Sequence, residues 1–413
     1  MKRRDFLKLA GAVSLAGCAT PASSKARVAI IGGGYGGATA AKYLRLWEPQ
    51  LDVVMIERAD GFISCPLSNL VLGGSRTMAD LRRGYDGLRR HGVSVIVDEV
   101  TAVDPGKRML TLARGKPLAY DRLVVSPGVD FNFGEIEGYQ AAQERMPHAW
   151  KAGEQTIALR KQLEGMPDGG VYLISIPLAP YRCPPGPYER ISQVAHYFRR
   201  AKPRAKVLVL DANPDVTSKG PLFKRAWQDL YPGMIEYRGN AKVVAVDARA
   251  MAVRTDFDTE KADVINVIPP QRAGDIAVKA GLVTHNERWC DIDWRSCESR
   301  AVKGIHVLGD ATLSASGMPK SGHMANQHGK TAAAAVIALL GGREPAAPVM
   351  NNTCYSFVSD KEVIHVASVH QWDAAQSTIL PVKGSGGVSS ARSEMEGAYA
   401  WSWAQNIWAD MFA

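Results

Sequence analysis

Short runs of apolar residues alternate with longer segments of helical periodicity along most of the chain. Such runs are typical of strands buried on both faces of a parallel sheet. They predict strands over Val28–Ile31, Leu51–Ile56, Tyr120–Gly128, Gly169–Ile176, Lys206–Asp211, Lys261–Ile268 and Gly304–Asp310. The periodic segments predict helices over Ala38–Leu46, Asp80–His91, Ala152–Leu163, Tyr188–Arg200 and Met324–Leu340, and a final aromatic helix with Trp401, Trp403 and Trp408. The alternation indicates an α/β fold, and 413 residues suffice for two or three domains.

The first predicted strand leads into a glycine-rich turn. Gly32, Gly34 and Gly37 follow it at G-x-G-x-x-G spacing, and Glu57 ends the next strand, twenty residues after Gly37. Glycines permit a tight turn and let a pyrophosphate approach the N-terminus of the following helix, while an acid at this distance suits a ribose hydroxyl. A purely structural turn is the alternative, but strand, helix, second strand and acid in register favour a dinucleotide site.

A second match lies far downstream. Gly309 and Asp310 end a short strand that precedes an alanine-rich helix, and Tyr120–Gly128 reads YDRLVVSPG. These segments resemble the places where two-dinucleotide flavoproteins leave and re-enter their FAD domain, with the Gly-Asp carboxylate holding the ribityl chain. We therefore expect FAD rather than NAD in a domain made of residues 27–140 and 270–342, with a second Rossmann-like domain at 141–269 and a C-terminal domain at 343–413.

The second α/β unit lacks a phosphate-binding turn. Where a second G-x-G-x-x-G is expected, Pro177–Pro187 reads PLAPYRCPPGP. Proline has no N–H group with which to cradle a pyrophosphate. The sequence therefore predicts that this unit binds no nicotinamide nucleotide.

The N-terminus predicts an export signal over residues 1–26. Arg3-Arg4 precedes a weakly apolar stretch, as in twin-arginine leaders, which serve proteins exported in the folded state, and Leu15–Cys18 resembles a lipoprotein cleavage box. Either Cys18 becomes a lipidated first residue or a plain cleavage site lies near Ala22. Residues 1–17 contribute three units to the formal net charge of +9, and no basic stripe predicts nucleic-acid binding. No apolar run is long enough to span a bilayer.

Five further cysteines remain in the predicted mature chain: Cys65, Cys183, Cys290, Cys297 and Cys354. An exported protein can form disulfides, so Cys290 and Cys297 are either a local bridge or two plain thiols. Cys65 follows the second strand, where we expect it beside the flavin, and Cys183 lies in the proline-rich loop with Glu189 six residues later. Cys183 and Cys354 either converge on the flavin as a redox pair or are unrelated core thiols. No C-x-x-C-H haem motif and no zinc-type cysteine pairs occur in the sequence.

Longer motifs resemble one family, the flavoprotein subunits of flavocytochrome c sulfide dehydrogenase. They include GGGYGGATAAKYL, PHAWKAGEQT, RCPPGPYERISQVA, KADVINVIPPQRAG, GIHVLGDA, MPKSGHMANQHGKTAAAAV and NTCYS. The resemblance implies a glutathione-reductase-like fold with a C-terminal α+β interface domain and a periplasmic location. It further implies FAD on Cys65 through a thioether and a Cys183–Cys354 disulfide that reacts with sulfide. Electrons then pass to a separate c-type cytochrome subunit, so that haem is on the partner alone. Pro66 after Cys65, where relatives carry an aromatic residue, and the lipoprotein-like box depart from the family pattern.

Glu189 is a candidate proton acceptor for this chemistry, and the alternative is that its carboxylate only caps the following helix.

Three other functions remain open for the chain. A sulfide:quinone oxidoreductase shares the fold and the disulfide, and a pyridine-nucleotide disulfide reductase would use Cys65 as a lone redox thiol. The third is a flavin-binding subunit without catalysis. The sequence does not fix the sulfur product or the oligomeric state.

Overall fold

The computed structural model describes residues 25–413. The twin arginine at Arg3-Arg4 and the cleavage box ending at Cys18 lie outside these residues. None of the helices in the described part of the chain combines the length and the apolar character needed to cross a membrane.

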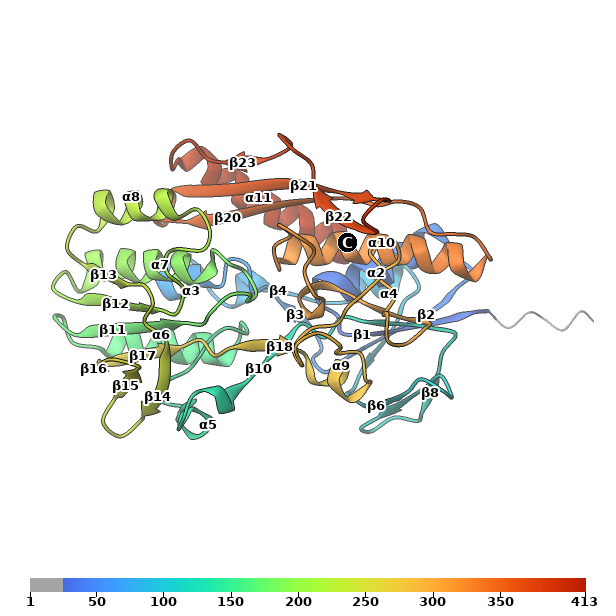
Figure 1. Ribbon diagram of the computed structural model, residues 1–413, viewed down its shortest axis with the longest axis horizontal. Coiled ribbons are helices and arrows are strands. Elements are labelled where there is room, and N and C mark those ends of the chain that lie inside the picture. Colours follow the sequence, from blue (N-terminus) through green and yellow to red (C-terminus); the bar gives the residue numbers. More distant parts are fainter. Residues whose placement is uncertain (1–24) are drawn as a thin grey trace, which may run out of the picture.

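A five-stranded parallel sheet forms the first Rossmann-like unit, in the order β19-β9-β1-β2-β5. Its strands are β1 (Arg27–Ile31), β2 (Asp52–Glu57), β5 (Ser94–Val97), β9 (Arg122–Val125) and β19 (Ile305–Val307). Val28 lies opposite Val53 on one side and Arg122 on the other, and the β1 residues after Arg27 are buried, which explains their continuous apolar run. The helices α2 (Tyr35–Trp47) and α10 (Gly322–Leu340) pack against each other beside this sheet (Figure 1).

The second Rossmann-like unit is a four-stranded parallel sheet in the order β13-β12-β11-β17, at the left of Figure 1. Its elements are α6 (Glu154–Gly165), β11 (Val171–Ile176), α7 (Gly186–Ala201), β12 (Lys206–Asp211), α8 (Gly220–Leu230), β13 (Ile235–Arg238) and β17 (Val264–Val267). The chain leaves the first unit through β10 (Val129–Phe131) and returns through β18 (Gln271–Ala273), and these two strands pair with each other. The second unit is thus an insertion in the first.

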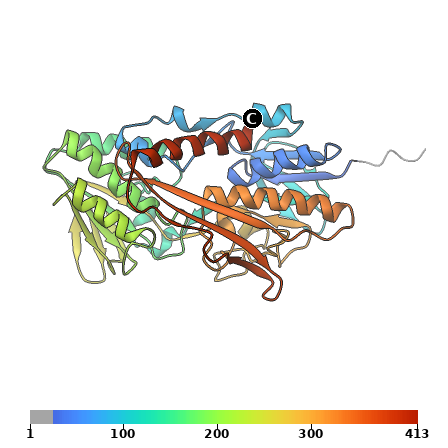
Figure 2. The ribbon, with the colours of Figure 1, turned by 90° about the horizontal axis from the view of Figure 1, so that it is seen from above.

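A long hairpin connects the two units. β20 (Val349–Phe357) and β21 (Val363–Asp373) run along both, and β20 contacts α7 of the second unit and α10 of the first (Figure 2). The hairpin is followed by β22 (Thr378–Pro381), β23 (Gly387–Val388) and α11 (Glu394–Phe412). The α11 helix packs on α2, where Trp408 Nε1 donates to Tyr35 Oη at 3.3 Å. The predicted fold of two Rossmann-like units and a C-terminal α+β part is confirmed.

The smaller elements agree less closely with the sequence predictions. The helix predicted over Asp80–His91 is wrong: it is divided into η1 (Ala79–Leu81), β4 (Arg82–Arg83) and α4 (Asp86–Arg90). Gly87 lies so close to the end of α11 that a Cβ there would be 1.4 Å from the Phe412 carbonyl oxygen. Tertiary packing therefore determines the secondary structure of this segment more than its periodicity does.

The remaining elements are β3 (Phe62–Ile63), α3 (Asn69–Gly73), β6 (Val100–Asp104), β7 (Met109–Leu112), β8 (Leu118–Ala119), η2 (Phe133–Glu135), α5 (Tyr139–Ala142), β14 (Val243–Asp247), β15 (Ala252–Thr255), β16 (Thr259–Lys261), α9 (Asp275–Lys279) and η3 (Gly309–Ala311).

Candidate active site

The turn between β1 and α2 requires glycine at two positions. Gly32 has a φ of 94°, and a Cβ there would lie 2.3 Å from the Ser126 carbonyl oxygen. A Cβ on Gly37 would lie 1.9 Å from the Gly32 carbonyl oxygen. Gly34 precedes the helix as its N-cap. The turn is therefore a tight backbone cradle at a helix N-terminus, which suits a pyrophosphate.

Glu57 lies at the end of β2 beside this cradle. Its carboxylate accepts hydrogen bonds from the backbone nitrogens of Gly33 at 2.7 Å and Arg58 at 2.8 Å. Glu57 and Gly32 line one cavity together with Ser126 and Asp98. The carboxylate of Glu57 thus lies next to the glycine turn, where a residue that binds the ribose hydroxyls is expected.

Asp310 provides an independent test of the FAD prediction. Its Oδ1 atom is buried and has no hydrogen-bond partner within residues 25–413. Burial raises the pKa of this carboxyl group, an effect that the charges of Arg182 and Lys320 oppose. A buried acceptor without a donor is costly, and a hydroxyl from a polyol chain such as ribityl would satisfy it. Together with the glycine cradle and Glu57, this site fits FAD.

Three cysteines from distant segments line one pocket: Cys65, Cys183 and Cys354. Cys65 follows β3, Cys183 lies in the loop before α7, and Cys354 lies on β20. Trp150, Glu189 and Trp403 also line this cysteine pocket. No S–S bond joins any of the cysteines within the described residues, so Cys183 and Cys354 are present as thiols.

The loop that carries Cys183 has a constrained backbone. Cys183 has a φ of 56°, and its N–H donates to the Lys320 carbonyl of the first unit at 2.8 Å. A Cβ on Gly186 would lie 3.0 Å from the Cys183 sulfur. Burial raises the pKa of Cys183, and the neighbouring Cys354 and Glu189 raise it further. Burial also raises the pKa of Cys354, where Lys219 and a hydrogen bond from Asn352 act in the opposite direction.

Glu189 is a buried carboxylate on the first turn of α7. It accepts hydrogen bonds from Asn69 Nδ2 and from the Phe357 backbone nitrogen, both at 2.8 Å. Its recorded partners therefore belong to α3 and the end of β20 rather than to its own helix. Burial raises its pKa above the usual value of 4.5. A raised pKa makes this carboxylate a better proton acceptor than an exposed glutamate.

The sequence analysis missed two buried cations around this pocket. The Arg190 guanidinium donates to Asn69 Oδ1 at 3.0 Å and to the carbonyl oxygens of His148 and Ala149. Lys219 donates to the carbonyl oxygen of Cys354 and to Ser356 Oγ. Arg190 adjoins Glu189 in the quoted RCPPGPYER motif, which was a usable signal, whereas Lys219 lies in an ordinary polar loop.

The second unit carries an acid where the first carries Glu57. Asp211 ends β12, but its carboxylate accepts hydrogen bonds from Tyr188 Oη and Tyr237 Oη at 2.8 Å each and from the backbone and side chain of Asn213. The residue is fully buried. An acid enclosed by protein donors has no free oxygen for a ribose, which agrees with the prediction made from Pro177–Pro187.

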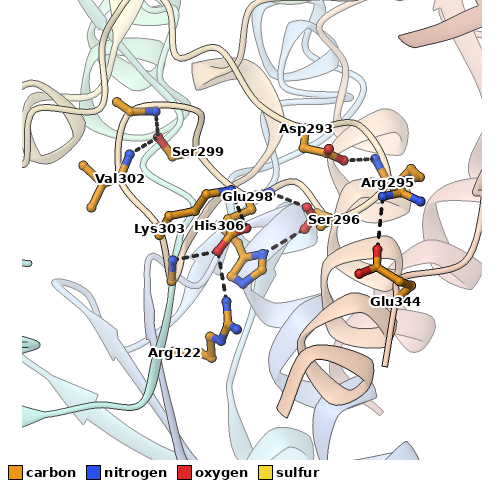
Figure 3. Close-up of polar contacts among 12 residues, drawn as sticks. Arg122, Asp293, Arg295, Ser296, Glu298, Ser299, Val302, Lys303, His306 and Glu344 are labelled. Atoms are coloured by element: carbon orange, nitrogen blue, oxygen red, sulfur yellow. Dashed lines mark hydrogen bonds and ion pairs between the residues drawn. The ribbon is translucent and has the colours of Figure 1, made fainter. Parts of the chain in front are cut away.

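Cys290 and Cys297 are both buried, and they too are thiols. Polar contacts fix the segment around Cys297. Glu298 pairs with Arg122 at 3.0 Å, and His306 Nδ1 lies 2.8 Å from the Ser296 carbonyl oxygen (Figure 3). Of the two alternatives left open by the sequence, the structure has two thiols without a bridge, and both pack in the core beside the first sheet.

Three family models match the chain. The model for the central part of the sulfide dehydrogenase (flavocytochrome c) flavoprotein chain matches residues 156–269. The model for the flavin-binding part of flavocytochrome c sulphide dehydrogenase matches residues 346–412. A pyridine nucleotide-disulphide oxidoreductase model matches residues 26–163.

Individual relatives agree with these matches. The sulfide dehydrogenase (flavocytochrome c) flavoprotein chain of Chlorobaculum thiosulfatiphilum is 49% identical over 45 residues, which is 94% of that sequence and 11% of this one. The mitochondrial sulfide:quinone oxidoreductase of Mus musculus is 23% identical over 74% of this chain and 71% of its own length. The solved sulfide:quinone oxidoreductase of Aquifex aeolicus has a TM-score of 0.75 at 19% identity, covering 94% of this chain and 91% of that one. This last similarity concerns the fold alone.

Proposed function

Because the chain belongs to the family of flavocytochrome c sulfide dehydrogenase flavoprotein chains, we propose that it oxidises sulfide through Cys183 and Cys354 and passes the electrons to a c-type cytochrome subunit. It is a FAD-dependent, sulfide-oxidising flavoprotein. The observation that carries the proposal is the convergence of the two cysteines on one pocket with Cys65, although Cys183 and Cys354 are 171 positions apart in the numbering.

The residues of the pocket suit thiol–disulfide exchange. In the oxidised form of the pair, HS⁻ forms a bond to one cysteine sulfur, the Cys183–Cys354 bond breaks, and its electron pair leaves on the other sulfur as a thiolate. The sulfide sulfur is thereby oxidised to a persulfide. Glu189, whose pKa is raised by burial, takes the persulfide proton. Bound FAD supplies the two-electron acceptor for the thiolate.

Cys65 is the proposed point of covalent FAD attachment. It lines the same pocket, and the backbone nitrogen of Ala152 lies 3.4 Å from its sulfur. Acid denaturation should leave FAD on the wild-type protein and release it from Cys65→Ala. Free FAD from the denatured wild type would refute the thioether and leave the rest of the proposal in place.

The electron acceptor distinguishes two candidate functions. Sulfide:quinone oxidoreductases are among the relatives, so a quinone is the second candidate. A quinone enzyme would need an apolar surface at its C-terminus, whereas α11 buries Ile407, Trp408, Met411 and Phe412 against the body of the protein. Because these side chains are not available to a membrane, their inward packing favours a cytochrome over a quinone as the electron acceptor.

We further propose that the protein is exported by the twin-arginine route and works in the periplasm, with haem on the partner alone and with Cys18 as a possible lipid anchor. Intact mass of the protein isolated from membranes and from the periplasmic fraction reports leader cleavage and lipid together. Retention of residues 1–17 in the mature protein would refute export by this route.

The central test is anaerobic stopped-flow at the flavin absorbance band after mixing with sulfide. Wild type should bleach, while Cys183→Ser and Cys354→Ser should not. Both variants should still bleach with dithionite, which separates a lost sulfide reaction from a damaged flavin. Bleaching of both variants at the wild-type rate would refute the role of the pair. Turnover with cytochrome c and with a soluble quinone then decides the acceptor.

A further inference from the structure

Lys219 is a buried lysine that contacts the backbone of Cys354, one of the residues that line the cysteine pocket. It precedes α8, has a φ of 57° and is 7% exposed. Its ammonium donates to the Cys354 carbonyl oxygen at 3.0 Å, to Ser356 Oγ at 2.8 Å and to the Ile364 carbonyl oxygen at 3.3 Å. The loop of the second unit thus holds a cation against the strand that carries Cys354, without itself being among the described residues that line the pocket.

The three hydrogen-bond partners of this ammonium are all neutral. Within the described residues, no carboxylate lies within salt-bridge distance of Lys219 Nζ. The nearby Glu189 is bound by Asn69 and Phe357, and Glu396 pairs with His365 at 3.0 Å. A buried ammonium without a counterion is costly, because hydrogen bonds alone do not neutralise its charge.

The charged and titratable groups around Lys219 come from four elements. They are Cys183 in the loop before α7, Glu189 on α7, Cys354 on β20, and Glu396 on α11. Burial lowers the pKa of Lys219 to about 8, and of the groups that raise it, Cys354 acts most strongly. The protonated Cys354 thiol leaves the ammonium uncompensated, whereas a Cys354 thiolate would compensate it.

We propose that Lys219 is a positioning residue that makes Cys354, rather than Cys183, the thiolate formed when sulfide opens the cysteine pair. The proposal rests on the sulfide chemistry proposed above. HS⁻ bonds to the Cys183 sulfur, the Cys183–Cys354 bond breaks, and its electron pair leaves on the sulfur of Cys354, the residue whose carbonyl oxygen the ammonium binds. The better-stabilised thiolate leaves faster, so the cation sets the direction of the attack. Asn352 Nδ2, at 3.4 Å from the Cys354 sulfur, donates to that sulfur directly.

Alkylation of the reduced holoprotein tests this without sulfide. The pair is reduced, the reductant removed, and iodoacetamide added at a series of pH values, and Cys354 and Cys183 are then quantified by peptide mass. In the wild type, the Cys354 midpoint should lie below that of Cys183. Lys219→Met should raise the Cys354 midpoint by about one pH unit, which is about a tenfold loss of thiolate below the midpoint. Lys219→Arg should keep most of the wild-type midpoint.

Lys224→Met is the matched control, because Lys224 lies on α8 just after Lys219 and its half-exposed ammonium pairs with Asp215 instead. It should leave both midpoints unchanged. Equal Cys354 midpoints in wild type and Lys219→Met would overturn the proposal. If Lys219→Met does not fold with its flavin, the wild type alone decides, since a Cys183 midpoint at or below that of Cys354 would also overturn it. If sulfide fails to bleach the flavin while the Lys219-dependent midpoint holds, the sulfide function fails and the role of Lys219 in thiolate formation stands.

Discussion

The two parallel sheets of this protein are built on one plan but carry different loops. Each has a strand, a turn, a helix and a second strand that ends in an acid. In the first unit, the turn is made of glycines and Glu57 borders a cavity. In the second, the turn is made of prolines and Asp211 is enclosed by tyrosines. The helix N-terminus of the second unit faces the cysteine pocket instead, with Gly186 and Glu189 in its lining. The same plan thus carries a glycine cradle in the first unit and part of the cysteine-pocket lining in the second.

The largest expected effect comes from adding one methyl group to each helix start. Gly37→Ala should yield protein with roughly tenfold less flavin or none, because the new Cβ would lie 1.9 Å from the Gly32 carbonyl oxygen and open the turn. Gly186→Ala should keep its flavin and lose sulfide reactivity, since its Cβ would press on Cys183 and Trp150. The flavin-to-protein absorbance ratio and sulfide bleaching measure the two effects.

Gly165→Ala is the control, because a Cβ there would meet no atom of the described residues within 4 Å. It should behave as the wild type in both assays. Full flavin content in Gly37→Ala would show that the first turn does not bind the cofactor as we infer.

The next effect concerns nicotinamide nucleotides. NADH and NADPH should reduce the flavin at least about a hundredfold more slowly than sulfide does, since the turn of the second unit is made largely of prolines and Asp211 is enclosed by protein donors. Anaerobic mixing at the flavin band measures the rates. Rapid bleaching by either nucleotide would contradict our interpretation of Pro177–Pro187 and favour a disulfide reductase.

A smaller effect distinguishes the two acids. Glu57→Gln should weaken flavin retention with little change in stability, whereas Asp211→Asn should keep the flavin and lower stability by about 1–3 kcal/mol, because the buried hydrogen-bond network loses an acceptor oxygen. Flavin release during dialysis and denaturant unfolding measure the two outcomes. Equal flavin loss in both variants would indicate that Asp211 also serves the cofactor.

The smallest expected effect is a change with pH in the stability difference between the wild type and Asp211→Asn. Burial raises the pKa of Asp211 above its ordinary value of 3.8, so the folded protein holds this proton more tightly than the unfolded chain does. Its contribution to stability is fully present below pH 3.8 and is lost as the pH rises through the folded-state pKa. The cost of Asp211→Asn should therefore shrink as the pH rises from 4 towards 7. Thermal midpoints of both proteins in one buffer series check this, and a constant difference would contradict it.

The sequence predicted the first unit well because one segment contains its strand, glycine turn, helix and acid. The pocket was harder to predict. The residue types of Cys183 and Cys354 suggested redox chemistry, but only the fold brings both side chains into the lining of one pocket. The bonds from Asn69 to Glu189 and from Lys219 to Ser356 join residues 120 and 137 positions apart, and such pairs leave no periodic signal in the sequence. The same long-range packing, at Gly87, made the prediction for Asp80–His91 wrong.

The position of α11 has a consequence for how the protein is synthesised. Trp408 bonds to Tyr35 across 373 residues, and Asp410 receives hydrogen bonds from Tyr43 of α2 and Asn326 of α10. The helix α2 is therefore covered by a segment that is translated long after it, since Tyr35 and Trp408 are 373 positions apart. Contacts of such sequence separation form late and slowly, and the exposed face of α2 needs protection until then. Cofactor insertion is thus expected to follow the synthesis and docking of α11 rather than to accompany the synthesis of α2.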